Sequence, residues 1–269
     1  MSMKYALITG AKSLLAHAVI ESIKKDYAFF LVDLSPSLRE MYQDIDNASF
    51  IVGDVTKEET IKKIVEEVSK KTSQLDLVIH MAGIVELGSL VEVNPTILEK
   101  VFATNLFSIY HINQILLPLL IPFKGRIIHV SSEYGRLLGL PFHSFYTMSK
   151  HALEIYNDSL RRELKGLGIK VIKIRPGAFK TSMQSRITQQ FEEQVKQTKY
   201  FKDPLLKMQG MMLKELKRAK NPEKIIKTFR KAIYSRKPKI AYDVGNSFKM
   251  KLLNALPPRL QDWILAKFF

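Results

Sequence analysis

The hydrophobic and polar positions of this chain form a repeating pattern over its first 176 residues. Short apolar runs alternate with longer segments of helical character, which is typical of βαβ units. The runs are nearly continuous in apolar character, as expected of parallel strands that are covered on both faces. We expect six of them to form strands, at residues 5–9, 28–33, 49–53, 75–81, 126–131 and 170–175. The pattern therefore predicts the α/β class, with a doubly wound parallel sheet.

Two Asn-Pro pairs mark expected helix starts, because Asn is a favoured N-cap and Pro fits the first helical position. Asn94-Pro95 predicts a long helix to about Leu117, and Asn221-Pro222 predicts another helix. The chain shows no internal repeat and no low-complexity linker. We therefore expect one domain over residues 1–269, with a core at 4–183 and a helical lid and basic extension at 184–269 folded onto the sheet.

Length and composition narrow the class of protein. The chain has 269 residues, of which 46% are hydrophobic, so it can bury the core of one large domain. It has no cysteine, which excludes disulfides and thiolate chemistry. Because a strand pattern already begins at Tyr5, we expect no cleaved leader and a cytoplasmic location. The longest uninterrupted apolar stretch, 115–123, is far shorter than the roughly 20 residues that a membrane-spanning helix needs.

Positive charge is concentrated towards the C-terminus. Residues 1–183 hold 22 basic and 19 acidic side chains, whereas residues 184–269 hold 20 and 7, within a net charge of +16. Such a field attracts phospholipid headgroups or nucleic acid, although a solvated Lys-rich face without a partner gives the same pattern. No nucleic-acid motif or aromatic platform accompanies the charge, so we expect no nucleic-acid partner.

The candidate chemistry begins with Tyr146 and Lys150, which stand four residues apart ahead of a helical run. Four residues bring both side chains onto one face of a helix. An ammonium group beside a phenol stabilises the phenolate, so we expect the Tyr146 pKa to fall below its reference value of about 10. Such a pair can serve as a general acid and base for a carbonyl or an alcohol. This spacing also arises by chance, so the surrounding motifs decide its meaning.

The turn after the first strand is a candidate site for a dinucleotide. Backbone N–H groups at a helix N-terminus would meet the pyrophosphate there, and Gly10 can make the tight turn. Leu14 and Ala16 occupy positions where a TGxxxGxG pattern has glycines, so an ordinary strand-to-helix loop is the alternative. The candidate cofactor residues in this turn are Gly10, Lys12, Ser13, Leu14 and Leu15.

Asp33 closes the second strand and bears on the choice of cofactor. Its carboxylate can accept hydrogen bonds from the adenosine ribose and would repel a 2'-phosphate, which favours NAD over NADP. Lys12 could help to bind a 2'-phosphate, and an Asp at the end of a strand is often only a turn former. NAD is therefore the expected cofactor, with NADP as the alternative.

Three further residues complete the pattern. Asn105 lies in a helical stretch, where Asn is a poor helix former and is expected to bind a water or nearby backbone groups. Ser131 and Ser132 end the fifth strand. In their order along the chain these features resemble the short-chain dehydrogenase/reductase family. The resemblance covers residues 4 to about 183 and implies a Rossmann-like sheet with the cofactor across its carboxyl edge.

The resemblance also implies roles for individual residues. Tyr146 would be the acid and base, Lys150 would lower its pKa and hold the nicotinamide ribose, Ser132 would bind the substrate oxygen, and Asn105 would anchor a water. No metal is implied. The remaining cofactor contacts carried over are Asp54 and Val55 for the adenine, Ala82 and Gly83 for the adenosine, and Pro176, Gly177 and Thr181 for the carboxamide.

This sequence departs from the family pattern in three places. Leu14 replaces a glycine, and His80-Met81 replaces the Asn that usually precedes Ala-Gly. The segment from Ser132 to Tyr146 is one residue longer than in the family pattern, which makes Ser131 a substitute candidate for Ser132. The first two departures motivate a second hypothesis, a non-catalytic dinucleotide-sensing or membrane-associated binding protein on the same fold. The four catalytic candidates favour the enzyme.

Substrate choice is expected to lie in residues 137–145 and 183–219, as the resemblance implies. The second segment holds Met208, Met211, Met212 and Leu213. Met-rich walls suit a bulky steroid-, retinoid- or lipid-like alcohol or ketone, although these positions also fit a helix core. Residues 248–269 form a basic amphipathic segment that would lie at a membrane surface or dock on the domain or a second subunit. We expect a homo-oligomer.

Overall fold

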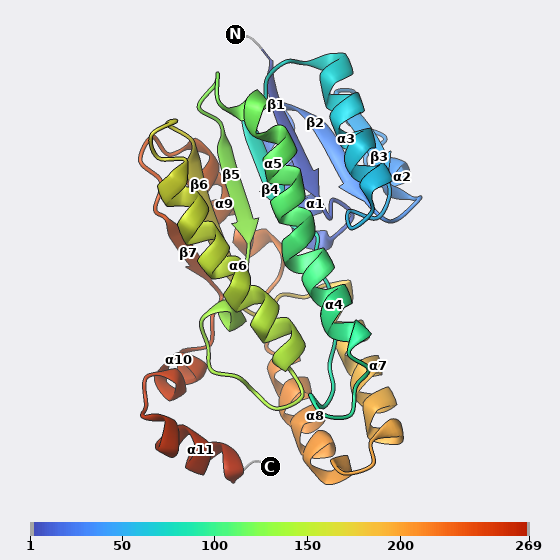
Figure 1. The fold of residues 1–269 in the computed structure, drawn as a ribbon, viewed down its shortest axis with the longest axis vertical. Coiled ribbons are helices and arrows are strands. Elements are labelled where there is room, and N and C mark those ends of the chain that lie inside the picture. The colour runs from blue at the N-terminus through green and yellow to red at the C-terminus, as the bar shows by residue number, and fades with distance from the viewer. Residues whose placement is uncertain (1–2, 268–269) are drawn as a thin grey trace.

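The computed structural model describes residues 3–267, except for the side chain of Ser182. Its centre is one parallel sheet of seven strands in the order β3-β2-β1-β4-β5-β6-β7 (Figure 1). The order reverses between β1 and β4, and ligands bind at such switch points in open α/β sheets. The strands are β1 (Lys4–Thr9), β2 (Tyr27–Asp33), β3 (Ala48–Val52), β4 (Leu77–His80), β5 (Arg126–Val130), β6 (Lys170–Pro176) and β7 (Ala241–Val244).

Helices follow nearly every strand. α3, for example, begins with two glutamates and ends with two lysines, an arrangement that complements the helix dipole. The helices are α1 (Leu14–Ile23), α2 (Leu38–Met41), α3 (Glu58–Lys71), α4 (Thr96–Phe102), η1 (Ala103–Phe107), α5 (Ser108–Leu120), η2 (Glu133–Gly135), α6 (Ser144–Glu163), α7 (Ser182–Gln197), α8 (Lys202–Leu216), α9 (Glu223–Tyr234), α10 (Phe248–Asn254) and α11 (Pro258–Ala266).

The predicted α/β class and the six predicted strands are confirmed, with boundaries that shift by one or two residues. The seventh strand, β7, was missed. It has four residues, three of them half-buried and Asp243 exposed, and it lies at the edge of the sheet. A strand this short and this exposed gives no apolar run from which it could be predicted.

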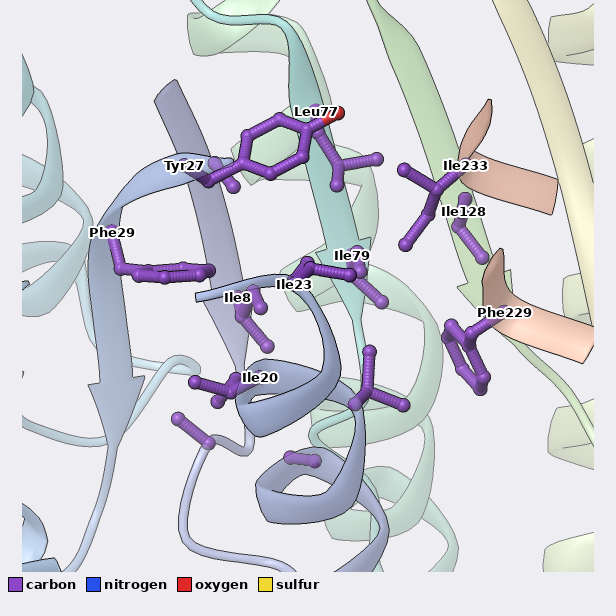
Figure 2. Close-up of a cluster of buried hydrophobic side chains, with 14 of the residues drawn as sticks. Ile8, Ile20, Ile23, Tyr27, Phe29, Leu77, Ile79, Ile128, Phe229 and Ile233 are labelled. Carbon is purple, nitrogen blue, oxygen red and sulfur yellow. The ribbon is translucent and has the colours of Figure 1, made fainter. Parts of the chain in front are cut away.

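Both faces of the sheet are covered. One apolar cluster joins the sheet to α1 and α9, and a second joins it to α3, α5 and α6. Figure 2 shows the first cluster, in which Ile20 and Ile23 of α1 and Phe229 and Ile233 of α9 surround Ile79 of β4. Because α9 supplies part of this core, the expectation that the basic third is folded onto the sheet is confirmed for α9.

The predicted long helix from Asn94-Pro95 to about Leu117 is interrupted and ends later. Asn94 Oδ1 accepts a hydrogen bond from the Thr96 backbone at 3.0 Å, as an N-cap does. The helix then runs through one π-helical turn, η1, before α5 continues to Leu120. Asn105 lies in this π turn. Such turns are often found at functional sites.

Apart from α9 and β7, the elements of the C-terminal third lie beyond the carboxyl ends of the strands. α7 and α8 supply a third apolar cluster together with Phe142 and Tyr146. α10 and α11 contain no buried residue and extend below the sheet in Figure 1. Phe268 and Phe269, which belong to the predicted amphipathic tail, lie outside the described residues. The division into a core and a lid stays a prediction.

Candidate active site

The turn after β1 requires glycine at its first position. Gly10 has a φ of +67°, and a Cβ there would lie 2.5 Å from the Ala82 backbone nitrogen. Ser13 caps α1, since its Oγ accepts a hydrogen bond from the Ala16 backbone at 3.2 Å. Leu14 is the first residue of α1 and is 46% exposed, so it stands where a bound pyrophosphate would approach the helix.

Asp33 holds the loops on either side of it. Its two carboxylate oxygens accept hydrogen bonds from the backbone of Lys12 at 2.9 Å and of Ser35 at 3.0 Å. The Lys12 Nζ donates to Ser35 Oγ at 2.8 Å and also to Ser37 Oγ. The Asp33 carboxylate and the Lys12 ammonium group are therefore both hydrogen-bonded to the loop after β2, where an adenosine ribose would lie.

Asp54 and Val55 follow β3 at the same edge of the sheet. Asp54 Oδ1 accepts hydrogen bonds from the backbone and the hydroxyl of Thr56 at 2.9 and 2.8 Å, which fixes the start of α3. Val55 is buried. Gly53 donates its backbone N–H to the Asp33 carbonyl at 2.9 Å, so this loop is tied to the loop after β2.

Asn105 fixes the segment that follows β4. It is fully buried, and its Oδ1 accepts from the Ile84 backbone at 2.8 Å while its Nδ2 donates to the Ile84 carbonyl at 2.9 Å. Nδ2 also donates to Ser149 Oγ on α6 at 2.9 Å. A Cβ on Gly83 would lie 3.2 Å from Asn105 Oδ1 and 3.6 Å from Lys150 Nζ. Asn105 is thereby placed beside Lys150 through local backbone groups.

α6 brings Tyr146 and Lys150 to the same place. Both are buried, and the Lys150 Nζ lies 5.6 Å from the Tyr146 ring centroid while donating to the Val130 carbonyl at 3.0 Å. The Ser132 hydroxyl acts on the Tyr146 phenol and lowers its pKa. Ser131, the substitute candidate, lies instead beside Gly135 and Glu154. Ser132 is therefore the serine that meets Tyr146.

The expected direction of the Tyr146 pKa is wrong. Burial raises the Tyr146 pKa to about 12, and the Ser132 hydroxyl only partly opposes this effect. Burial also lowers the Lys150 pKa to about 8, although the Glu154 carboxylate raises it. The reason is that Lys150 donates to a backbone carbonyl rather than to the phenol, so burial outweighs the attraction between the two groups.

The loop after β6 requires a second glycine. A Cβ on Gly177 would lie 2.4 Å from the Gly245 carbonyl oxygen, and Gly177 N–H donates to the Val244 carbonyl at 2.9 Å. Pro176 ends β6, and Thr181 stands at the N-terminus of α7. The missed strand β7 therefore determines how closely this loop approaches the site.

About half of the candidate catalytic and cofactor residues line one cavity of about 430 Å³. Its wall includes the catalytic candidates Ser132, Tyr146 and Lys150, while Asn105 lies behind Gly83. The cofactor candidates in the wall are Ser13, Leu15, Gly83, Lys150, Pro176, Gly177 and Thr181. The remaining candidates lie outside the wall, and they are Gly10, Lys12, Leu14, Asp33, Asp54, Val55 and Ala82.

The cavity also exposes residues that the sequence motifs did not single out. Glu133 and Tyr134 directly follow Ser132, and the Tyr134 ring lies 4.4 Å from the His143 ring, centroid to centroid. Burial lowers the pKa of His143 to about 4. Met212 and Glu215 of α8 complete the opposite wall, whereas Met208 is core. Adjacency to Ser132 was the signal that could have identified Glu133.

Residues 4–192 match the family model described as short chain dehydrogenase. The chain is 30% identical over 291 residues to estradiol 17-beta-dehydrogenase 2 of Mus musculus, covering 100% of this chain and 76% of that protein. It is 25% identical over 274 residues to 3-ketodihydrosphingosine reductase of Bacteroides thetaiotaomicron, covering 100% and 99%. Both matches extend through the basic C-terminal third.

Solved structures support the same fold. A short-chain dehydrogenase from Streptomyces avermitilis superimposes with a TM-score of 0.79 at 23% identity, covering 99% of this chain and 98% of that one. A short-chain dehydrogenase/reductase from Burkholderia phymatum in complex with NAD gives a TM-score of 0.75 at 19% identity, covering 89% of each. ElxO with NADP bound gives 0.71 at 24% identity, covering 90% and 97%.

Proposed function

The chain belongs to the short-chain dehydrogenase family, and from this premise we propose that it interconverts a hydrophobic alcohol and its carbonyl compound. The pair is a secondary alcohol and its ketone, or a primary alcohol and its aldehyde. As a member of that family it is an NAD(P)-dependent oxidoreductase. The observation that carries the finer proposal is the cavity in which Ser132, Tyr146 and Lys150 meet a mostly apolar wall.

The residues at the carboxyl edge of the sheet fit a dinucleotide. At Gly10 and Gly177 a Cβ would lie within 3 Å of neighbouring backbone, so glycine is required at both turns. The N-terminus of α1 would hold the pyrophosphate, and Lys150 would hold the ribose next to the nicotinamide. Once bound, the nicotinamide supplies or accepts the hydride. The Asp33 carboxylate lies at this edge and would repel a 2'-phosphate, so we propose NAD as the preferred cofactor. Lys12 is available to bind the 2'-phosphate of NADP.

Tyr146 would donate the proton to the carbonyl oxygen during reduction and take it back during oxidation. Ser132, which lines the cavity together with Tyr146, would hold the same oxygen. Lys150 keeps its charge up to about pH 8, so at neutral pH its ammonium group favours the phenolate as the proton leaves. Asn105 would position a water next to Lys150. These four roles are our proposal for the chemistry.

The substrate is expected to be lipophilic. Met183, Ile187, Met212 and Leu216 of α7 and α8 line the side of the cavity opposite β5 and β6. Apolar walls of this size bind extended or ring-shaped hydrocarbon groups, and Met adapts to their shape. A steroid-, retinoid- or lipid-like alcohol therefore fits the proposal. The names of the two relatives, an estradiol dehydrogenase and a ketodihydrosphingosine reductase, agree with this class.

A homologous series of ketones tests this function. NADH and NADPH absorbance would be followed with 2-ketones of six to fourteen carbons at a fixed saturating dinucleotide concentration. We expect kcat/KM to rise with chain length, by up to about threefold to fourfold for each added methylene that is buried, because burying a CH₂ contributes about 0.8 kcal/mol. If neither dinucleotide is consumed with any ketone, the proposed function is wrong.

We also propose that α10 and α11 bind a membrane surface peripherally. Phe248, Leu252 and Trp263 are 78%, 58% and 57% exposed, and four basic side chains but one acidic side chain lie among residues 248–267. Exposed apolar groups surrounded by positive charge suit an anionic lipid interface. Within residues 3–267, no helix combines the length and apolarity that crossing a bilayer requires.

Vesicle pelleting tests this contact with a matched control. The Leu252→Ser variant should lose most of its binding to vesicles containing phosphatidylserine, and raised salt should weaken binding of the wild type. Leu90→Ser is the control, because Leu90 is similarly exposed, at 56%, but lies in the segment between β4 and α4. Equal loss in both variants would contradict the contact. If concentration-dependent dimerisation is lost instead, the tail belongs to the expected homo-oligomer.

A further inference from the structure

Glu133 is a buried carboxylate in the wall of the catalytic cavity. It directly follows Ser132 and is only 7% exposed. Its Oε2 accepts a hydrogen bond from the Ser247 backbone at 2.7 Å. Oε1 takes part in no hydrogen bond or ion pair within residues 3–267, although the side chain lines the cavity. Because the side chain is largely buried and lines the cavity, Oε1 is available to accept a hydrogen bond from a ligand bound there.

The surroundings of Glu133 do not supply a partner for Oε1. Burial raises the pKa of Glu133, the Ser247 N–H opposes this, and the second cavity carboxylate, Glu215, raises it further. Lys220 and Lys251 act on Glu133 from beyond ion-pair distance, and Lys251 is paired with Asp243 at 3.6 Å. The cavity lining also holds two cations, but Arg186 is paired with Glu86 at 2.6 Å and Lys150 donates to the Val130 carbonyl, so neither is paired with Glu133.

Glu133 lines the same cavity as the proposed proton donor, Tyr146. Its charge raises the pKa of Tyr146, an effect that requires the carboxylate to lie within electrostatic range of the phenol. It raises the pKa of Tyr134 as well. A neutral ligand would leave both effects in place. A cation bound at Glu133 would cancel them and would make the Tyr146 phenolate easier to form.

Resting on the proposed function, we propose that Glu133 is a specificity-determining residue that binds an ammonium group of the substrate close to the reacting carbon. The substrate class is then a long-chain amino alcohol and the corresponding amino ketone. The ammonium group would donate to Glu133 Oε1, and the hydrocarbon chain would lie along the apolar side of Met183, Ile187 and Leu216. Charge-assisted hydrogen bonds of this kind are the strong ones in a buried site.

Glu133 also has a structural role, which the test must separate from substrate binding. Its Oε2 ties η2 to the N-terminus of α10 through Ser247. A glutamine amide oxygen can accept the same hydrogen bond, so Glu133→Gln keeps the tie and removes the charge. A purely structural loss would lower activity with every substrate equally. Loss of an ion pair would act only on the cationic substrate.

Three alcohols of one chain length provide the test, namely 2-aminododecan-3-ol, its N-acetyl derivative and dodecan-3-ol, each oxidised with NAD. In the wild type, kcat/KM for the amine should exceed that for the acetamide by at least about tenfold, the factor that corresponds to about 1.4 kcal/mol. Glu133→Gln should bring this ratio to within about twofold of one. Glu192→Gln, a change of an exposed glutamate on α7, is the matched control and should keep the wild-type ratio.

The outcomes separate the two proposals. If the wild type oxidises dodecan-3-ol but shows no preference for the amine, the ammonium site is wrong and the oxidoreductase function stands. If Glu133→Gln lowers kcat/KM for all three alcohols by the same factor, Glu133 acts only through structure and the inference is overturned. If the wild type oxidises none of the alcohols and reduces none of the ketones, the proposed function itself fails.

Discussion

Helix α6 borders two buried polar clusters, of which one lines the cavity and the other does not. At its N-terminal end, Tyr146 and Lys150 line the cavity, with Lys150 donating to a backbone carbonyl. Three turns further on, Asn157 joins a cluster that lies outside the cavity wall. We call this second group the His–Asn cluster, and its members are His80, Asn113, His129 and Asn157.

The His–Asn cluster pairs most of its polar atoms internally, although His80 Nδ1 and Asn157 Nδ2 have no hydrogen-bond partner among the described residues. Asn113 Oδ1 lies 2.8 Å from His80 Nε2, and its Nδ2 lies 3.0 Å from His129 Nε2. The Nδ1 of His129 lies 2.8 Å from Asn157 Oδ1. Burial shifts pKa values in both clusters, yet only the cavity cluster can exchange its partners for a reactant. The comparison teaches that burial alone does not identify an active site, because access to a cavity is also required.

Acid should act more strongly on the His–Asn cluster, which holds two buried histidines, than on the cavity wall, which holds one, His143. Burial lowers the pKa of His80 to about 4 and that of His129 to about 3, the latter helped by His80. The unfolded chain therefore binds more protons below about pH 6.5, and stability is lost as the pH falls from 6.5 towards 4. A shift from 6.5 to about 4 corresponds to about 3 kcal/mol for His80.

Urea unfolding from pH 7 to pH 4.5 would measure this loss. His80→Gln should reduce the pH dependence of the free energy of unfolding, since a neutral amide takes up no proton, while His129 and His143 should account for the part that remains. His111→Gln, at an exposed position on α5, is the control and should keep the wild-type slope. A wild-type free energy of unfolding that is constant from pH 7 to pH 4.5 would contradict the buried neutral state of both histidines.

Glu154 lies between the clusters on α6 and should affect stability and chemistry together. Although burial raises its pKa, hydrogen bonds from Arg175 and Lys173 hold the pKa below its ordinary value. Glu154→Gln would leave the Lys173 charge buried with weaker compensation, at a cost of about 3 kcal/mol in unfolding free energy. Because Glu154 also raises the Lys150 pKa, the alkaline limb of the kcat profile should move to lower pH.

The measurements are urea unfolding at pH 7 and a pH profile of ketone reduction. A matched control is Glu163→Gln, at the C-terminal end of the same helix and exposed to solvent. It should shift neither quantity. A Glu154→Gln enzyme with wild-type stability, or with an alkaline limb that stays in place, would show that Glu154 does not link the clusters.

Asn113 should affect stability without affecting chemistry. Asn113→Leu keeps the approximate volume but leaves His80 and His129 without their shared partner, which should cost about 2 kcal/mol. The variant kcat should stay within about twofold of the wild type, because Asn113 lies outside the cavity wall. Gln114→Ala, on the exposed side of α5, should change the unfolding free energy by less than about 0.5 kcal/mol.

Much of this arrangement could be predicted from the sequence. Continuous apolar runs identified six strands, because a buried parallel strand has no polar face, and four-residue spacing placed Tyr146 and Lys150 together. The pKa of Tyr146 could not be predicted. Its direction depends on whether Lys150 turns towards the phenol or towards Val130, which spacing along a helix does not determine.

Other features depend on contacts between distant parts of the chain. The partners of His80, on β5 and α5, are 33 or more residues away, so its departure from the family pattern looked like a defect rather than a core contact. Likewise, β7 is defined by its register with β6 rather than by its own composition. The environment of Glu133 could not be predicted either, because it is formed by Glu215 and Ser247 of the C-terminal third.

Single-turnover hydride transfer tests the role of Tyr146 most directly. Wild type and Tyr146→Phe would be mixed with NADH and a twelve-carbon 2-ketone, and NADH absorbance followed in a stopped-flow instrument. We predict a loss of at least about a hundredfold in the variant, the usual contribution of a general acid, with the same melting temperature and NADH affinity within about threefold. Equal transfer rates in the two enzymes would contradict the assignment of Tyr146 as the proton donor.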